Sequence, residues 1–317
     1  MRFLVVGAGS WGTAFTRVLL DREHEVVLAC HTTEQADAIA CNGWNPRYLQ
    51  NVDLRGAEPV PLSASPADVD VIAVAVPSGA FAAVVAGLPG DAPVLSLTKG
   101  LDPKTGERLS TRVAGRTVAV LSGPNMAEEI GQGLPTAAVI ASDDGDLAGR
   151  LQHAVNSALF RAYVNPDVVG VELCAAAKNV IALAAGAVDG LELGDNAKAA
   201  LIARGLAEMS RLGEAAGARS ETFAGLAGMG DLVVTCWSRY GRNRHAGELI
   251  AEGLTPQQAV AEIGQTVEGL TTAPALRDLS RRLGVELPIT EGVCAVLSGQ
   301  SLGELLAGLM GREPTEE

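Results

Sequence analysis

Hydrophobic residues in the first half of the chain occur in short, nearly continuous runs, the pattern of strands that are buried on both faces. The runs cover Phe3 to Val6, Val26 to Cys30, Val60 to Leu62, Asp70 to Val76, Val94 to Thr98, Val118 to Ser122 and Thr136 to Ile140. Segments with helical spacing separate several of them, at Glu34 to Ala40, Gly79 to Ala86, Thr105 to Val113 and Asp146 to Ala154. This alternation predicts an α/β domain with a doubly wound sheet.

The pattern changes at Asn165-Pro166, after a last run from Ala158 to Val164. Beyond this point helical periodicity dominates to about Leu309, and no convincing strand appears. We therefore expect a sheet domain over residues 1–166 and an all-α domain over residues 167–317. The polar stretch from Gly311 to Glu317 is expected to fray.

A glycine-rich turn directly follows the first hydrophobic run. The segment Gly7 to Gly12, GAGSWG, stands between that run and a helical pattern, which is the context of a dinucleotide-binding Rossmann-type domain. Gly7 permits the tight turn, Gly9 lets the backbone approach a pyrophosphate, and Gly12 lets the helix pack on the strand. The helix N-terminus would then hold the phosphates. A glycine-rich turn without a ligand is the alternative, and this context argues against it.

The end of the second strand is where such a domain usually selects between NADH and NADPH. An acidic side chain favours the ribose hydroxyl, whereas an arginine favours the 2′-phosphate. This chain has His31, Thr32 and Thr33 there, and Glu34 only after them. His31 is either a contact to adenine or phosphate or a solvated loop residue. The sequence therefore leaves the choice of cofactor open.

One lysine lies in a segment that is apolar nearly all round. Lys178 has Cys174 to Ala177 on one side and Val180 to Ala182 on the other, within the stretch Val171 to Arg204, so we expect a buried helix. Burial disfavours the ammonium form and lowers the lysine pKa, which makes Lys178 a candidate general acid/base. A lysine whose head reaches water is the alternative. Asn179 points about 100° round the helix and would flank the same cleft.

Polar residues follow two further strand-like runs, at the strand ends beyond which doubly wound sheets bind their ligands. Lys99 follows Thr98, and it is either a ligand contact or an ordinary turn lysine. Ser122 to Asn125 offers backbone amides and a side-chain amide to the same cleft.

Two segments of the second half also stand out. Gly225 to Leu232 is dense in glycine, which lets backbone approach a ligand. Arg239, Arg242 and Arg244 fall within six residues and predict a local positive patch suited to a phosphate. A solvated loop is the alternative for these arginines.

Composition narrows the class of protein. The chain has 317 residues, 48% hydrophobic and 19% charged, which suits a globular protein with two domains. A net charge of -13 argues against nucleic acid or an anionic membrane as a partner. Five cysteines without a CxxC pair fit free thiols and suggest no metal site. Because the chain starts with a strand-like run and no clean apolar run reaches membrane-spanning length, we expect a cytoplasmic protein without membrane insertion.

Together these residues resemble the NAD(P)-dependent glycerol-3-phosphate dehydrogenases of the bacterial type. The resemblance covers nearly the whole chain, with eight motifs in the family's order. They are GAGSWGTA at Gly7 to Ala14, NPRYL at Asn45 to Leu49, LTKGL at Leu97 to Leu101, LSGPNMAEEI at Leu121 to Ile130, VELCAAAKNVIALAAG at Val171 to Gly186, LGDNAKAALIARG at Leu193 to Gly205, GLAGMGDL at Gly225 to Leu232 and GRNR at Gly241 to Arg244.

The resemblance implies reversible reduction of dihydroxyacetone phosphate to sn-glycerol 3-phosphate by NAD(P)H. It also implies that the product supplies glycerophospholipid synthesis. It implies that Lys178 donates and accepts the proton, and that Lys99, Asn179 and Asp231 complete the catalytic site. The substrate contacts it implies are Lys99, Gly123, Asn125, Lys178, Asp231, Thr235, Gly241, Arg242 and Asn243, the last two being a pair on the phosphate. The cofactor contacts it implies are Gly7, Gly9, Ser10, Trp11, Gly12, His31, Tyr48, Lys99, Ala127, Arg242 and Glu268.

The chain departs from the family's pattern at four places. Cys174 and Ala175 stand where a pair of glycines is usual. Asn125 stands where serine or threonine is usual, and Gly241 stands where bacterial members usually have serine. His31-Thr32 lacks the arginine common in members that use NADPH.

Two other functions compete with the dehydrogenase. A related reductase of a keto or hydroxy acid would need a carboxylate clamp near the hydride, whereas GRNR lies far in sequence from Lys178. A dinucleotide-sensing regulator would need no proton donor, so the presence of Lys99, Lys178 and Asp231 together argues against it. The sequence does not determine the oligomeric state and leaves a homodimer possible.

Overall fold

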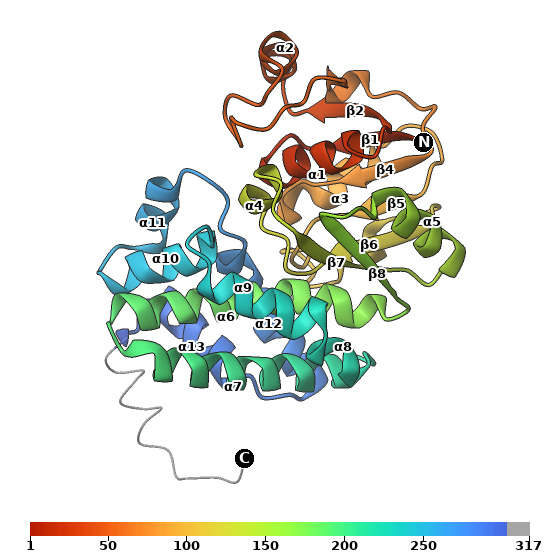
Figure 1. Ribbon diagram of the computed structural model, residues 1–317. Coiled ribbons are helices and arrows are strands. Elements are labelled where there is room, and N and C mark those ends of the chain that lie inside the picture. The colour runs from red at the N-terminus through yellow and green to blue at the C-terminus, as the bar shows by residue number, and fades with distance from the viewer. Residues whose placement is uncertain (303–317) are drawn as a thin grey trace.

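The first half of the chain folds into one eight-stranded sheet with helices on both faces (Figure 1). The structure is a computed structural model that describes residues 1–302. The strand order is β3-β2-β1-β4-β5-β6-β7-β8, and all neighbours pair in parallel except β6 and β7. The strands are β1 (Arg2–Val6), β2 (Glu25–Cys30), β3 (Ala57–Pro61), β4 (Val71–Val74), β5 (Val94–Ser96), β6 (Val118–Ser122), β7 (Thr136–Ala141) and β8 (Phe160–Asn165).

Helices cover the two faces of this sheet because the strand side chains are apolar on both sides. One hydrophobic cluster joins Phe15, Ile39 and Leu151 to the sheet, and another joins Phe81 and Val85 to the opposite face. The predicted Rossmann-type doubly wound fold is therefore confirmed. The helices of this half are α1 (Ser10–Leu20), α2 (Thr33–Asn42), α3 (Ser78–Ala86), α4 (Ala127–Gly131) and α5 (Gly145–Val155), with 3-10 turns η1 (Leu62–Ala64) and η2 (Leu109–Arg112).

The helix predicted over Thr105 to Val113 is wrong, because only η2 forms there. The Asp102 carboxylate accepts the backbone N–H groups of Lys104 and Thr105 at 2.9 and 3.3 Å, and Gly106 takes a positive φ of 68°. These two local features hold the chain in a turn instead of a helix. The predicted strand Val60 to Leu62 is also shifted, since β3 ends at Pro61 and η1 begins at Leu62.

Among the described residues, no strand follows Asn165, and the second half is helical as predicted. The expectations for helix up to Leu309 and for a frayed Gly311 to Glu317 fall partly or wholly outside the described residues. The helices are α6 (Val168–Gly190), α7 (Gly194–Ala215), α8 (Ser220–Ala224), the π-helical turn η3 (Leu226–Gly230), α9 (Asp231–Trp237), α10 (Arg242–Ala251), α11 (Pro256–Ile263), α12 (Glu268–Leu283) and α13 (Pro288–Leu297).

Helix α6 is the central element of the helical half and packs against α7, α9, α10, α12 and α13 (Figure 1). Its 23 residues are long and apolar enough to cross a membrane by length and composition, whereas the sequence led us to expect no clean apolar run of that length. However, 89% of its most apolar window is buried inside the protein. In this structure α6 is therefore the core helix of a globular fold.

Glycines allow α6 and α10 to pack with their backbones in contact. A Cβ added at Gly186 would lie 1.7 Å from the Arg244 carbonyl oxygen, and one added at Gly247 would lie 1.9 Å from the Leu183 carbonyl oxygen. Because the obstacles are backbone atoms, neither can rotate away as a side chain would. This close contact fixes the N-terminus of α10 relative to α6.

We predict that Gly186→Ala destabilises the protein, because the added methyl group must push two helix backbones apart. Overpacking of this kind costs about 1–3 kcal/mol, a fall in the melting temperature of several degrees. The matched control is Gly149→Ala in α5, where an added Cβ meets nothing within 4 Å. The free energy of unfolding of this control should equal that of the wild type or exceed it by up to about 1 kcal/mol, because alanine is the better helix former. Equal melting temperatures for the two variants would contradict the prediction.

Candidate active site

The glycine-rich turn forms the cradle expected for a dinucleotide. Gly7 has a φ of 107°, and an added Cβ would lie 2.5 Å from the Ala75 carbonyl oxygen. A Cβ at Gly12 would lie 1.8 Å from the Gly7 carbonyl oxygen, so this residue holds α1 against the turn. A Cβ at Gly9 would meet nothing within 4 Å, and no side chain caps the first turn of α1. The turn therefore presents open space and free amides, which fit a pyrophosphate.

A buried asparagine holds this turn in shape. The Asn45 side-chain amide donates to the Ala8 carbonyl and to the Thr13 hydroxyl, both at 2.9 Å. Its carbonyl oxygen accepts the backbone N–H groups of Arg47 and Tyr48 at 3.1 and 3.2 Å. Sequence reasoning gave Asn45 no role, although it opens the NPRYL motif. It also ties Tyr48, a predicted cofactor contact, to the glycine-rich turn.

The other predicted cofactor residues are distributed around the same turn. Ser10 and Trp11 begin α1, and Ala127 begins α4, which packs against α1. His31 follows β2 with an exposed side chain. That side chain has no hydrogen bond within residues 1–302, so it is free to meet a ligand.

The two candidate lysines converge on one carboxylate. Lys178 on α6 donates to Asp231 Oδ1 and, at 2.9 Å, to the Thr235 hydroxyl. Lys99, in the loop that follows β5, donates to Asp231 Oδ2 at 3.0 Å. Asp231 is 1% exposed and Lys178 is 4% exposed. The sheet half and the helical half thus meet at a buried ion-pair triad.

Burial and charge set the protonation of this triad. Desolvation lowers the pKa of Lys178 to about 7, and the Lys99 charge acts in the same direction, while the Asp231 carboxylate partly opposes both. Burial alone would raise the pKa of Asp231, but the two ammonium groups outweigh it, and that pKa is lowered. Asp231 is therefore a stable anion, whereas Lys178 exchanges its proton in the neutral range.

Lys99 is also fixed by the strand end that carries Gly123 and Asn125. Its ammonium group donates to the Gly123 carbonyl oxygen at 3.2 Å and to Asn125 Oδ1 at 3.0 Å. The side-chain N–H groups of Asn125 are buried and have no partner among the described residues. A buried amide without an acceptor is costly, and an oxygen of a bound ligand would satisfy it.

The side chain of Ser122, to whose hydroxyl the sequence analysis gave no role, also contacts Asp231. The fully buried Ser122 hydroxyl donates to Asp231 Oδ2 at 3.2 Å. Its position at the end of β6, next to Gly123, was the available signal. Ser122 helps to hold the carboxylate in the orientation that both lysines use.

Asn179 and Asn243 connect α6, α10 and α12. Asn243 donates to Asn179 Oδ1 at 3.0 Å and accepts the Gly269 N–H at 2.8 Å. Next to Gly269, Glu268 accepts the Ser78 N–H at 3.1 Å and the Ser78 hydroxyl at 2.5 Å. Since Ser78 begins α3, this contact brings Glu268 to the ligand edge of the sheet.

The predicted patch of three arginines is only partly present, because carboxylates neutralise Arg244, whereas Arg239 and Arg242 have no ion pair within residues 1–302. Arg244 donates to Asp189 at 2.7 Å and contacts Glu248 at 3.3 Å, while Arg239 stacks over the Tyr240 ring at 4.9 Å. Arg242 is exposed, begins α10, and has no hydrogen bond or ion pair within the described chain. A single arginine at an uncapped helix N-terminus is still suited to a phosphate.

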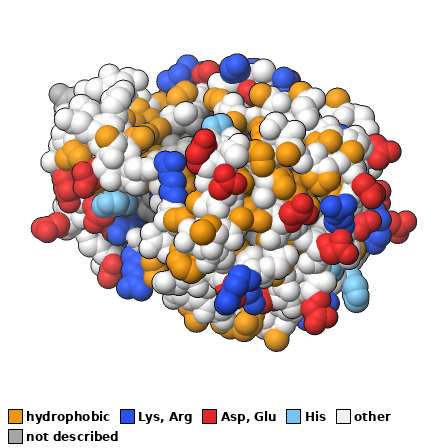
Figure 2. Space-filling view, turned by 90° about the horizontal axis from the view of Figure 1, so that it is seen from above, with side chains coloured by type: hydrophobic (Ala, Val, Ile, Leu, Met, Phe, Trp, Pro, Cys, Tyr) orange, Lys and Arg blue, Asp and Glu red, His pale blue; other side chains and the backbone are white. Residues whose placement is uncertain are grey.

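The net charge of -13 says little about where an anion could bind, and the local position of Arg242 says more. Figure 2 shows one face on which Asp and Glu side chains are scattered over the middle and the edge, with Lys and Arg in separate small groups among them. An anionic ligand is therefore met by local positive groups on an acidic protein.

Two family models match the chain over most of its length. The NAD-dependent glycerol-3-phosphate dehydrogenase N-terminus matches residues 3–148, and the C-terminus of the same family matches residues 167–305. The chain belongs to the NAD-dependent glycerol-3-phosphate dehydrogenase family. The predicted family is thus confirmed, as are the predicted classes of enzyme and cofactor, an NAD(P)-dependent oxidoreductase.

Relatives and solved structures agree with this membership. The chain is 43% identical to glycerol-3-phosphate dehydrogenase [NAD(P)+] of Moorella thermoacetica, over 99% of this chain and 96% of the relative. It is 44% identical to the enzyme of the same name from Halorhodospira halophila, over 99% and 97%. The crystal structure of glycerol-3-phosphate dehydrogenase from Coxiella burnetii superposes with a TM-score of 0.94 at 37% identity, covering 98% and 99% of the two chains.

The structure shows what surrounds two of these departures, Asn125 and Gly241. Asn125 uses its carbonyl oxygen on Lys99 and still keeps two donors, which a serine or threonine does not have. At Gly241 a Cβ would lie 2.8 Å from the Thr235 carbonyl oxygen. Glycine at this position therefore lets the turn between α9 and α10 pack against the C-terminal end of α9 without a clash.

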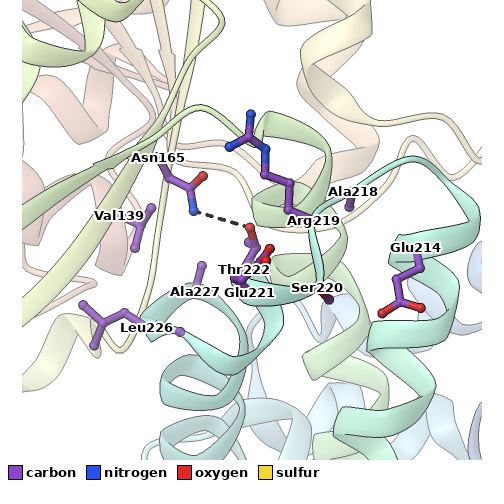
Figure 3. A pocket seen from close by; sticks show the side chains of 11 residues that line it. Val139, Asn165, Glu214, Ala218, Arg219, Ser220, Glu221, Thr222, Leu226 and Ala227 are labelled. Atoms are coloured by element: carbon purple, nitrogen blue, oxygen red, sulfur yellow. Dashed lines mark hydrogen bonds between the residues drawn. The ribbon is translucent and has the colours of Figure 1, made fainter.

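A cavity of about 660 Å³ lies outside this site (Figure 3). It opens between the end of β8 and α8, where the Asn165 amide donates to the Thr222 hydroxyl at 3.5 Å. Figure 3 shows Arg219 and Glu214 at its border, and none of the family's predicted site residues lines it. This cavity is therefore separate from the candidate active site.

We predict that Asp231→Asn lowers the pKa of Lys178 further, because the carboxylate is the group that stabilises its ammonium form. NMR titration of protein with isotope-labelled lysine side chains measures this, with the signal assigned by Lys178→Arg. The wild-type signal should titrate near pH 7. A Lys178 signal that is unchanged or shifted to higher pH in Asp231→Asn would contradict the assignment.

Proposed function

We propose that this chain catalyses the reversible, NAD(P)H-dependent reduction of dihydroxyacetone phosphate to sn-glycerol 3-phosphate. The observation that carries the proposal is the convergence of Lys178 and Lys99 on the buried Asp231, next to the unpartnered amide of Asn125. A carbonyl group that accepts hydride needs a proton donor and fixed polar groups, and this cluster offers both.

The glycine cradle supports NAD(P)H as the cofactor, because Gly9 leaves open space at the N-terminus of α1. When bound, the cofactor supplies a hydride to the carbonyl carbon. Ser10, Trp11, Tyr48, Ala127 and Glu268 are proposed to hold it in the groove beyond the strand ends. His31 is proposed to contact the adenosine end. The choice between NADH and NADPH stays open at His31 and Thr32.

Lys178 is the proposed general acid in reduction and the general base in oxidation. Its ammonium donates a proton to the substrate oxygen as the carbon accepts hydride, and the neutral amine takes that proton back in the reverse reaction. Lys99 and Asn125 orient the same end of the substrate by hydrogen bonds. Asp231, Ser122 and Thr235 hold the lysines in position, and Asn179 lines the cleft through its bond to Asn243.

Arg242 and Asn243 are the proposed contacts to the substrate phosphate. Arg242 supplies a free guanidinium at the N-terminus of α10, and Gly241 lies directly before it. A phosphate held away from the reacting carbon gives binding energy that orients the carbonyl group. The network of Asn243, Asn179 and Gly269 connects the phosphate end to the helix that carries Lys178.

We further propose that the sheet half acts as a cofactor domain over residues 1–166 and the helical half as a substrate domain over residues 167–317. The product carries the glycerol backbone of glycerophospholipids, so the enzyme is proposed to supply their synthesis in the cytoplasm.

Purified protein should oxidise NADH or NADPH when dihydroxyacetone phosphate is added, and the loss of nicotinamide absorbance measures this. Unphosphorylated dihydroxyacetone and a keto acid are the control substrates, and both should be reduced far more slowly than dihydroxyacetone phosphate. Protein that binds the cofactor but oxidises neither form with dihydroxyacetone phosphate would contradict the proposed function.

Arg242→Ala should raise the KM for dihydroxyacetone phosphate by roughly 10- to 100-fold, because a charge-assisted contact contributes about 1.5–3 kcal/mol. The catalytic efficiency with unphosphorylated dihydroxyacetone should not change. Arg239→Ala, in the same loop but already stacked on Tyr240, is the control and should keep the wild-type KM. An unchanged KM in Arg242→Ala would remove this arginine from the phosphate site.

A further inference from the structure

A carboxylate on α6, Asp189, binds the first turn of helix α10 through Arg244. The family resemblance assigned no role to this carboxylate. Asp189, in the last turn of α6, accepts Arg244 at 2.7 Å and both hydrogen bonds of Lys198 at 2.7 and 2.9 Å. The side chains of Lys198 and Arg244 are 7% and 16% exposed. Two nearly buried cations therefore share one carboxylate, with Glu248 a second partner of Arg244.

This network connects four helices. Asp189 belongs to α6, Lys198 to α7 and Arg244 to α10, and Lys198 also lies 4.9 Å from the ring centroid of Trp237 at the end of α9. Figure 1 shows α10 lying along α6, with α7 on the other side of α6. Arg244 is two residues from Arg242, so its anchor acts on the first turn of α10.

The glycine contacts and the ion pairs constrain α10 in different ways. Gly186 and Gly247 allow the two backbones to touch, which sets the distance between the helices. Dispersion contacts between such surfaces have little direction. A carboxylate, by contrast, fixes the position of the guanidinium with which it forms a charge-assisted hydrogen bond. Loss of the Asp189 charge would leave Lys198 and Arg244 as like charges around one site, and they would repel.

We propose that Asp189 is a positioning residue for substrate phosphate: by binding Arg244 and Lys198, it fixes the first turn of α10 so that Arg242 meets the phosphate. This inference rests on the proposed function, in which Arg242 is a phosphate contact. Asp189 touches neither substrate nor cofactor. Its effect is on the KM for the phosphorylated substrate, and turnover at saturation depends on Lys178 instead.

The test is steady-state kinetics of Asp189→Asn, which keeps the side-chain shape and removes the charge. The KM for dihydroxyacetone phosphate should rise about tenfold with kcat within about twofold, and catalytic efficiency with unphosphorylated dihydroxyacetone should stay the same. Asp189→Glu should restore most of the lost affinity. Glu291→Gln removes a carboxylate that pairs with Arg281 between α12 and α13, and this matched control should leave every constant unchanged.

Combination with Arg242→Ala separates this inference from the proposed function. If Asp189 acts through Arg242, then Asp189→Asn should raise KM less than about twofold further in the Arg242→Ala background. A full additional tenfold rise, or an unchanged KM in Asp189→Asn alone, would overturn the inference. An unchanged KM in Arg242→Ala would instead overturn the phosphate assignment itself.

A second variant covers the case in which Asp189→Asn does not fold. Asp189→Asn with Lys198→Met removes the repulsion between the two cations and leaves Arg244 with only Glu248. The double variant should keep the raised KM while regaining stability, as measured by its melting temperature. A wild-type KM in this folded double variant would show that Arg244 needs no anchor at Asp189, and the inference would fail.

Discussion

The structure depends on one buried negative charge. Asp231 lies at the junction of the sheet and the helical half, and it binds a lysine from each, Lys99 and Lys178. Neither lysine could be buried there unpaired, because removing an ammonium group from water costs several kcal/mol. The carboxylate therefore has two effects: it connects the halves of the molecule, and it keeps Lys178 charged part of the time.

The rest of the architecture serves to bring these groups together. Parallel strands β5 and β6 end at the same edge of the sheet, which places Lys99 beside Gly123 and Asn125. Helix α6 can be apolar on nearly every side because other helices surround it, so the single lysine on it is desolvated. Backbone contact with α10 then brings Arg242 and Asn243 to the same region. The strand ends, the apolar helix and the glycines are each local in the sequence, but together they bring residues from distant parts of the chain into one site.

Sequence reasoning succeeded where one residue's local context determines its environment. The apolar neighbours of Lys178 were enough to predict its burial, and the glycine turn was enough to predict a cradle at α1. It failed where the decisive partner is distant in sequence. Arg244 looks like a ligand contact until Asp189, 55 residues earlier, neutralises it. The helix predicted over Thr105 to Val113 failed for a local reason, since Gly106 takes a positive φ of 68°, which an α-helix cannot accommodate.

The most direct test of this account is the pH dependence of kcat/KM in both directions. If Lys178, with its pKa lowered to about 7, is the acid in reduction and the base in oxidation, then reduction should slow as pH rises through 7. Oxidation of sn-glycerol 3-phosphate should accelerate over the same range. Lys178→Met should abolish both transitions while binding of the cofactor persists. Profiles that run in the same direction, or transitions that remain in Lys178→Met, would contradict the assignment of Lys178 as the acid/base.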